Sequence, residues 1–304
     1  MSRWTILPEA PADAPALHAL TIAAFRRASE ANVLGSHRTY DPAYEAQLSL
    51  VAWAEDHIIG HVLFTPATVR LAGADVSAVA VGPVTVAPHW QRQGVGAALM
   101  EAGHARARER GATLAFLIGH PSYYPRLGYE PLFGFCQAPL TPERLPPGTE
   151  PLLCRPVAIT DGPWLAAQHR REWQDVDFAW MRGGELGAWT VPGAETVLWW
   201  TRDGRRAAYT QKSADGQRCL VVADDAALAR QVLLTLRPPR LDHHPHGWLA
   251  RTVLPELGCV ASVARAAPCM ARALVPSALD AVRDGWSRDA VPGSTTFPVS
   301  FLAF

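Results

Sequence analysis

Lysine is almost absent from this sequence: Lys212 is the only one, so arginine carries nearly all of the positive charge. Lysine and arginine together number 28, as do aspartate and glutamate, and the formal net charge is zero. The arginines are scattered along the chain and form no basic patch. Because binding to nucleic acid or to an anionic membrane surface depends on excess positive charge, we expect neither as a partner.

Long apolar runs are missing as well. No stretch reaches the roughly eighteen uninterrupted apolar residues of a membrane span, and the first residues lack the apolar core of a signal peptide. The five cysteines include no Cys-x-x-Cys pair, and their odd number argues against a disulfide framework. These absences predict a cytoplasmic protein with buried, unreactive thiols.

Length and composition favour two well-cored domains. The chain has 304 residues, of which 49% are hydrophobic and 18% charged. Residues 138–156 hold six prolines and show no apolar period, which is typical of a linker or surface strap. We therefore predict a first domain over residues 1–137, a linker over residues 138–156 and a second domain over residues 157–304.

The most informative segment covers residues 84–99. An apolar run over residues 79–86 predicts a buried strand, and apolar residues at helical spacing predict a helix that begins near Gly94. The turn between them reads Gln91-x-x-Gly94-x-Gly96. Glycines let the backbone approach a ligand, and a helix N-terminus adds unpaired N–H donors. A strand, a glycine turn and a helix start together predict a cradle for a pyrophosphate.

Two familiar phosphate-binding motifs do not fit this segment. A dinucleotide-binding fingerprint needs a third glycine, where Leu99 stands, and an acidic residue about twenty positions later. The residues at that place, 116–119, are apolar or glycine. A P-loop needs Gly-Lys-Ser/Thr, and the segment has no lysine.

Two motifs instead resemble the GNAT superfamily of acetyl-CoA-dependent N-acetyltransferases. The first is Val86-x-Pro88-x-x-Gln91-Arg92-x-Gly94-x-Gly96, which is similar to the family's coenzyme-binding motif. The second lies about thirty residues later, where Tyr124 stands four residues before Gly128-Tyr129. The chain most resembles small bacterial members with a Gly-Pro-Val-x-Val strand and a Tyr-Tyr-x-Arg-x-Gly-aromatic segment. The resemblance covers roughly the first half of the chain.

The resemblance implies an α/β fold: a mixed α+β sheet with helices on both faces. It implies acetyl-CoA as cosubstrate, no metal, and direct attack by a primary amine of a small molecule or peptide within a ternary complex. It also implies the coenzyme-binding residues. They are Val84, Thr85, Val86, Gln91, Arg92, Gln93, Gly94, Val95, Gly96, Ala97 and Ala98.

Tyr124 matches the family's general acid, which protonates the leaving thiolate; the alternative is a tyrosine that only packs in the core. Val84 or Thr85 is expected to offer a backbone amide to the thioester oxygen. With both motifs present, we expect a working N-acetyltransferase. The alternative is a non-catalytic acetyl-CoA-binding or regulatory module.

The general base is not evident, because residues 76–86 contain no acidic side chain. His61, on the second predicted strand, is the first candidate, and a hydrogen-bonded structural histidine is its alternative. Glu30, His37 and His120 are further candidates, as is a water relay to solvent. The apolar tail over residues 299–304 is predicted to dock against the protein, and its terminal carboxylate is another candidate.

One further segment in each half of the chain is predicted to be a loop. Residues 29–41 are polar and are expected to be irregular, in a region that shapes the acceptor site in this fold. Asp242-His243-His244-Pro245-His246 has metal-ligating residue types, but Pro245 interrupts it and no cysteine is near. We predict a solvated loop there and no metal.

The second half repeats part of the first. A helix over residues 161–173, a hairpin over residues 196–211, a strand over residues 219–223 and a helix over residues 225–236 are predicted. Asp224-Asp225 stand where a second cradle would need bare amides, and two carboxylates would repel a pyrophosphate. We therefore predict a degenerate GNAT-like copy; an unrelated α+β domain is the alternative.

Overall fold

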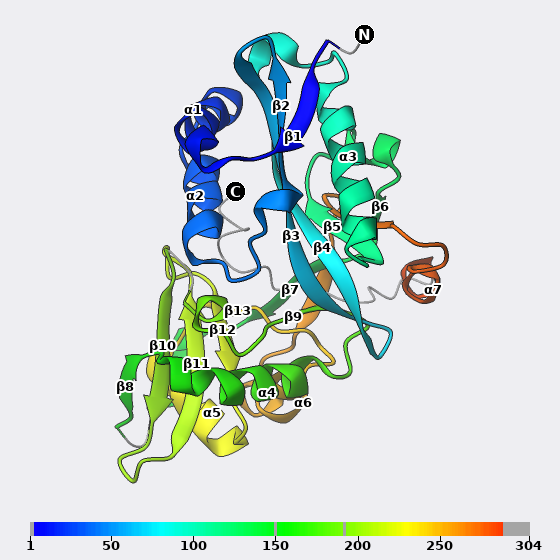
Figure 1. Ribbon diagram of the computed structural model, residues 1–304. Coiled ribbons are helices and arrows are strands. Elements are labelled where there is room, and N and C mark those ends of the chain that lie inside the picture. The colour runs from blue at the N-terminus through cyan, green and yellow to red at the C-terminus, as the bar shows by residue number, and fades with distance from the viewer. Residues whose placement is uncertain (1–2, 149–150, 191–192, 288–304) are drawn as a thin grey trace.

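The computed structural model describes residues 3–148, 151–190 and 193–287, and their strands form two sheets. The first sheet has eight strands (Figure 1), in the order β1–β2–β3–β4–β5–β15–β6, with β9 pairing along the C-terminal end of β3. Its strands are β1 (Thr5–Pro8), β2 (Ser49–Ala54), β3 (His57–Leu71), β4 (Ala74–Val86), β5 (Leu114–Ile118), β6 (Glu130–Pro131), β9 (Phe178–Met181) and β15 (Cys269–Ala273).

The second sheet has seven strands, in the order β14–β7–β13–β12–β11–β10–β8. They are β7 (Gly134–Pro139), β8 (Leu153–Pro156), β10 (Glu195–Trp200), β11 (Arg206–Lys212), β12 (Cys219–Val222), β13 (Arg240–Leu241) and β14 (Ser262–Arg265). The hairpin predicted over residues 196–211 and the strand predicted to begin at Cys219 are confirmed as β10, β11 and β12.

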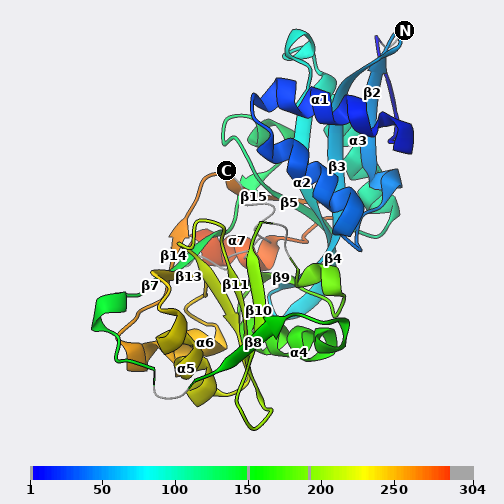
Figure 2. The same cartoon turned by 90° about the vertical axis from the view of Figure 1, so that its left-hand side faces the viewer.

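The two sheets have the same strand topology, and each half of the chain contributes a strand to the sheet of the other half. Each sheet has one parallel pair joined through a helix: β4–β5 through α3 (Val95–Glu109), and β12–β13 through α5 (Ala226–Leu236). Strand β15, from late in the chain, lies between β5 and β6, while β7 lies between β13 and β14. Both views show the chain crossing between the sheets (Figures 1 and 2). The predicted boundary at residue 137 therefore falls inside β7.

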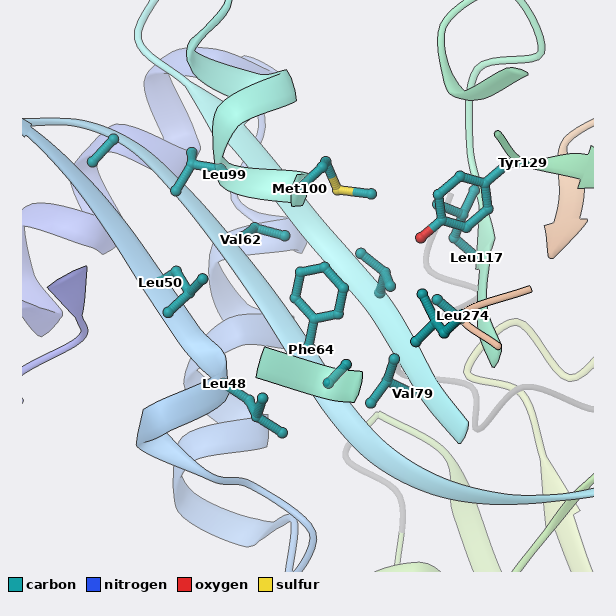
Figure 3. Close-up of a cluster of buried hydrophobic side chains, with 14 of the residues drawn as sticks. Leu48, Leu50, Val62, Phe64, Val79, Leu99, Met100, Leu117, Tyr129 and Leu274 are labelled. Atoms are coloured by element: carbon teal, nitrogen blue, oxygen red, sulfur yellow. The ribbon is translucent and has the colours of Figure 1, made fainter. Parts of the chain in front are cut away.

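Helices cover both faces of the first sheet. Helices α1 (Ala14–Phe25) and α2 (Ser29–Tyr40) lie on one face and α3 on the other (Figure 1). Alternation along the strands separates the side chains: Leu50 and Val62 pack toward α3, whereas their neighbours Val51 and Leu63 pack toward α1 and α2. Figure 3 shows Phe64 at the centre of the α3-side core, fully buried among Leu50, Val62, Val79, Leu99 and Met100.

The expectation that residues 29–41 are irregular is wrong, because they form α2. The preceding helix ends at Arg26, whose left-handed backbone (φ 59°) turns the chain. Glu30, Leu34 and His37 then recur at helical spacing and are all buried. Two of these three residues are polar, so a hydrophobic pattern does not reveal the helix.

The remaining helices lie in the second half of the chain, and the last of them follows the strand that joins the first sheet. They are α4 (Gly162–Trp173), α6 (Trp248–Thr252) and α7 (Asp280–Ser287). The helices predicted over residues 161–173 and 225–236 are confirmed as α4 and α5. None of the helices in the described ranges has the length and apolar character to cross a bilayer. The tail over residues 299–304 lies outside the described residues.

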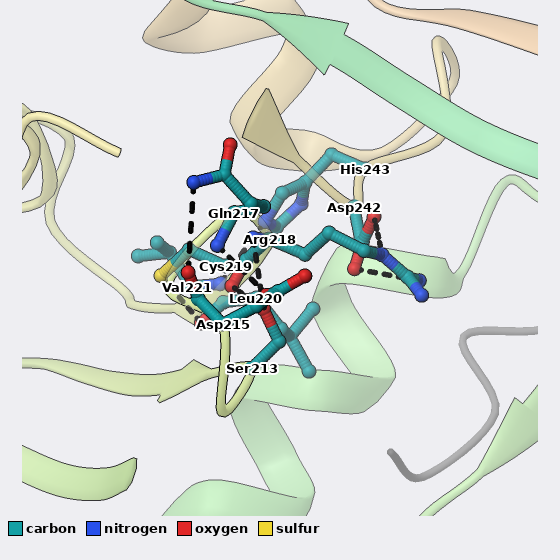
Figure 4. Close-up of polar contacts among 9 residues, drawn as sticks. All are labelled: Ser213, Asp215, Gln217, Arg218, Cys219, Leu220, Val221, Asp242 and His243. Atoms are coloured by element: carbon teal, nitrogen blue, oxygen red, sulfur yellow. Dashed lines mark hydrogen bonds and ion pairs between the residues drawn. The ribbon is translucent and has the colours of Figure 1, made fainter. Parts of the chain in front are cut away.

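Asp242, His243 and His244 are buried and His246 is exposed, which corrects the predicted solvated loop for most of the segment. His243 is fully buried; its Nε2 accepts a hydrogen bond from the Val221 amide at 3.1 Å, so its Nδ1 donates to Glu172 Oε1 at 2.8 Å. Asp242 pairs with Arg218 (Figure 4), their Oδ2 and Nη2 atoms 2.9 Å apart. These side chains join β12 to α4, and in the described part of the chain no group of histidine, cysteine or acidic residues is arranged to hold a metal.

A fragment of residues 1–137 is expected not to fold cooperatively. It lacks β15, which pairs with β5 from Leu114 to Ile118 and adds Met270 and Ala271 to the cores of the first sheet. It also carries most of β7 without the strands that flank it in the full chain. Thermal unfolding followed by circular dichroism, with the full chain measured in parallel, tests this. A sharp two-state transition in the fragment would show that the strand exchange is dispensable.

Candidate active site

Strand β4 is bulged next to its partner β3 and then separates from β5. The register moves from Phe64 opposite Val81 to Val62 opposite Val84, so Gly82 and Pro83 stand in the bulge. On its other side β4 pairs with β5 only over residues 78–80, although it runs on to Val86. The two neighbouring strands therefore diverge beyond Ala80 and leave one edge of β4 unpaired with β5.

A cavity of about 490 Å³ lies where the strands diverge. Its walls come from the bulged part of β4, the end of α1, the first turns of α2, the segment after β5 and one residue before β15. The lining residues are Ala24, Phe25, Arg27, Glu30, Val33, Val81, Gly82, Pro83, Val84, Val86, Gln91, Ile118, Gly119, His120, Pro121, Tyr124 and Pro268. Pro268 belongs to the second half of the chain, and its carbonyl accepts the Gly119 amide at 2.9 Å.

The predicted strand–turn–helix cradle is confirmed as a structure. Gly94 has φ 94° and precedes the first residue of α3, a backbone angle that favours glycine. The Gln91 side chain donates to the Val86 carbonyl at 3.2 Å and the Gln93 side chain to the His89 carbonyl at 2.7 Å, which fixes the turn. The first amides of α3 have no partner inside the helix and carry the positive end of its dipole.

Gly96 lies against the tyrosine pair that follows β5. A Cβ atom at this position would stand 2.7 Å from the Tyr123 hydroxyl. Tyr123 therefore reaches the cradle. Any side chain at position 96 must displace that hydroxyl and would enter the space in front of the helix N-terminus.

Tyr124 lines the cavity at the start of a short 3₁₀ turn, and its ring is held from three sides. A Cβ atom at Gly119 would lie 2.2 Å from the ring, and the rings of Tyr123 and Tyr129 are centred 5.0 and 5.8 Å away. Burial, and then the neighbouring Tyr123, raise the pKa of Tyr124 above its usual range. The hydroxyl is thus protonated at neutral pH and available as a proton donor.

Tyr129 anchors Tyr124 to the strand contributed by the second half. Its hydroxyl is 2.8 Å from His104 Nε2, and His104 Nδ1 is 2.8 Å from Nη1 of Arg272 on β15. Burial, followed by the positive charge of Arg272, lowers the pKa of His104 to about 4. A neutral imidazole therefore accepts from Arg272 and donates to Tyr129.

His61 does not lie in the cavity that Tyr124 lines. It is fully buried on the α1–α2 face of the sheet, where its Nε2 is 2.8 Å from Ser49 Oγ and 3.5 Å from Glu9 Oε2. Burial lowers the pKa of His61, although Glu9 opposes the effect. Ser49 also donates to Glu9, and Arg38 forms an ion pair with it. This position favours a structural, hydrogen-bonded role for His61 over the role of general base.

Replacing Glu9 by glutamine is expected to remove a pH-dependent part of the stability. Burial raises the pKa of Glu9, but bonds from His61, Arg38 and Ser49 outweigh it and lower the pKa from 4.5 to about 2. The carboxylate therefore stabilises the fold fully above about pH 4.5, and this contribution is lost as the pH falls toward 2. Urea unfolding at pH 7 should show a loss on the order of 3 kcal/mol, shrinking toward pH 3. A constant difference between the two pH values would contradict the linkage.

The sequence ranked Glu30 behind His61 as a candidate general base, but Glu30 is the one that lies in the cavity. It lies in the first turn of α2, is 4% exposed, and lines the cavity together with Tyr124. His120 lines the same cavity but is exposed, and His37 pairs with Asp41 elsewhere on α2. Once residues 29–41 are known to be helical, the spacing of Glu30, Leu34 and His37 identifies it as an inward-facing residue.

The corresponding turn in the second half is closed by its own side chains. Asp225 Oδ1 accepts the Leu228 amide at 2.9 Å and so caps α5. Asp224 Oδ2 accepts from the Trp164 indole at 3.0 Å, and its carbonyl accepts from Arg171 at 2.7 Å. A protein carboxylate thus occupies the helix N-terminus that corresponds to the cradle of the first half.

Comparison with known proteins agrees with this geometry. The family model described as an acetyltransferase (GNAT) domain matches residues 8–132. The uncharacterized N-acetyltransferase YjhQ of Escherichia coli K12 is 35% identical over 122 residues, which are 40% of this chain and 67% of that protein. A GNAT family acetyltransferase from Brucella melitensis, crystallised in complex with acetyl-CoA, is 32% identical over 42% of this chain and 82% of its own, with a TM-score of 0.38.

A further solved structure extends the likeness of the fold to both halves. The GCN5-related N-acetyltransferase from Kribbella flavida is 17% identical and superposes with a TM-score of 0.69 over 89% of this chain and 72% of its own. With the family model and the sequence relatives, this assigns the fold expected from the two motifs. The chain belongs to the GNAT acetyltransferase family and is an acyltransferase.

Proposed function

We propose that this protein transfers the acetyl group of acetyl-CoA to a primary amine of a small molecule or peptide, by direct attack within a ternary complex. One observation carries the proposal: a single cavity joins the bulged edge of β4, Gln91 of the turn that precedes α3, and Tyr124. The 32% identical Brucella protein, crystallised with acetyl-CoA, supports the same ligand here.

The coenzyme is assigned to the residues that surround the cradle. Amides near the start of α3, from Gln91 to Ala98, would receive the pyrophosphate, because anions bind at helix N-termini. The edge of β4 would lie along the pantetheine arm. Val84 lines the cavity, whereas the Thr85 side chain is buried beside His61 on the opposite strand. We therefore assign the amide that faces the thioester oxygen to Val84.

Tyr124 is assigned the role of general acid. Its hydroxyl is protonated at neutral pH and its ring is fixed, so it can donate a proton to the departing thiolate. The second half is assigned no coenzyme, because Asp225 caps α5 where a pyrophosphate would bind. We propose that it is a degenerate GNAT-like unit that supplies β15 to the working one.

The test is an acetyl-CoA turnover assay against a panel of amines, with release of free thiol as the readout, together with titration calorimetry. We expect thiol release that depends on an amine and a stoichiometry of one coenzyme per chain. Binding without turnover across the panel would favour the non-catalytic module. Two coenzymes per chain would contradict the degenerate assignment of the second half.

A further inference from the structure

Among the described residues that line the active-site cavity, Glu30 is the only one with a carboxylate. Its side chain is 5% exposed and forms an ion pair with Arg27, three residues earlier in the bend before α2, whose side chain is 47% exposed. Arg27 itself lines the cavity, and the other titratable groups there are His120, which is exposed, and Tyr124. Most of the remaining wall is apolar, including Phe25, Val33 and Ile118.

Burying a carboxylate in a largely apolar wall costs free energy, which the ion pair with Arg27 helps to offset. An isolated charge in an apolar environment is unfavourable, and a pair with a half-exposed arginine contributes little because water screens it. The N-terminus of α2 favours negative charge at Glu30 but does not require it to face a cavity. A single carboxylate in a largely apolar cavity wall is suited to orient a positively charged or proton-donating ligand.

We propose that Glu30 binds the ammonium group of the acceptor and accepts its proton; this inference rests on the function proposed above. The other acids near the sheet do not compete for the role. Glu9 is held by Arg38, Ser49 and His61 outside the cavity lining. Residues 76–86 of β4 carry no acidic side chain.

The proton balance closes with two protein groups. Glu30 takes one proton from the ammonium and later releases it to solvent. The neutral amine then forms the C–N bond, the C–S bond breaks, and the electron pair of that bond leaves on sulfur. Tyr124 protonates the thiolate and recovers a proton from the new amide nitrogen. One acetyl-CoA and one ammonium thus give one amide, one thiol and one proton.

Replacing Glu30 by glutamine keeps the shape of the side chain and removes its charge. We expect kcat/KM for the amine to fall by about 10²–10⁴-fold, which is the usual contribution of a positioned base. The loss should shrink as the pH rises toward the pKa of the acceptor amine, because a neutral amine needs no base, while the Kd for acetyl-CoA stays within about threefold of the wild-type value. The matched control is Glu55→Gln, the same change at an exposed turn between β2 and β3, which should leave rate and pH profile unchanged.

A second variant covers the case in which Glu30→Gln fails to fold. Glu30→Asp keeps a carboxylate but withdraws it by one methylene, so its kcat/KM should be lowered at neutral pH and should recover toward the wild-type value at high pH. A wild-type rate in Glu30→Asp, or a kcat/KM in Glu30→Gln that stays within about threefold of wild type or does not recover at high pH, would overturn the role of Glu30 alone. Absence of amine-dependent turnover in the wild-type protein would instead contradict the proposed function.

Discussion

Replacing Tyr124 by phenylalanine is expected to lower kcat by about 10²–10⁴-fold, because that is what a positioned general acid contributes. Phenylalanine preserves the contacts of the ring with Gly119 and Tyr129 and removes only the hydroxyl. The affinity for acetyl-CoA should therefore change by less than about threefold. The change separates a chemical role of Tyr124 from a packing role.

Steady-state kinetics with a good acceptor, together with titration of acetyl-CoA, measure the two effects independently. Tyr40→Phe is the matched control, since Tyr40 is 63% exposed and does not line the active-site cavity. The Tyr40→Phe variant removes the same hydroxyl group at a position where no effect on kcat is expected. A fall of less than about threefold in kcat for Tyr124→Phe would assign this tyrosine to the core.

Gly96→Glu is expected to weaken acetyl-CoA binding by at least about 100-fold, since juxtaposed like charges cost several kcal/mol. The Cβ atom alone would stand 2.7 Å from the Tyr123 hydroxyl. The added carboxylate would then compete with the pyrophosphate for the amides at the start of α3. The second half offers a natural parallel, because Asp225 caps the equivalent helix with its own side chain.

Titration calorimetry measures the loss, and thermal unfolding shows whether the fold survives. Gly96→Ala serves as the matched control: it introduces the Cβ atom without the charge and should weaken binding far less than the glutamate. Equal losses in the two variants would mean that crowding against Tyr123, and not charge, decides the result. An unchanged affinity in Gly96→Glu would place the coenzyme elsewhere.

The sequence by itself determined the cradle and the general layout of the elements. Residues 84–99 combine an apolar strand, a glycine turn and an apolar helix face, and these are local patterns that any fold must respect. Gly94 requires a positive φ, which the sequence signals directly. The helices and hairpin of the second half, and the two carboxylates that close its turn, could also be predicted for the same reason.

The exchange of β7 and β15 was decided only by the tertiary structure. Strands pair through backbone N–H and C=O groups that every residue except proline carries, so a sequence pattern shows that a strand exists but does not name its partner. The place of Cys269–Ala273 beside β5 depends on how the whole second half returns to the first sheet.

The burial of polar side chains is the other property that could be known only from the tertiary structure. His61 looked like a catalytic base because residues 76–86 carry no acidic side chain, whereas its hydrogen-bonding distance from Ser49 and its proximity to Glu9 indicate a structural role. Glu30 looked like part of a polar loop and lies in the cavity wall. A polar residue is equally compatible with solvent, with an ion pair and with an active site, and only the neighbours brought by tertiary packing distinguish the three.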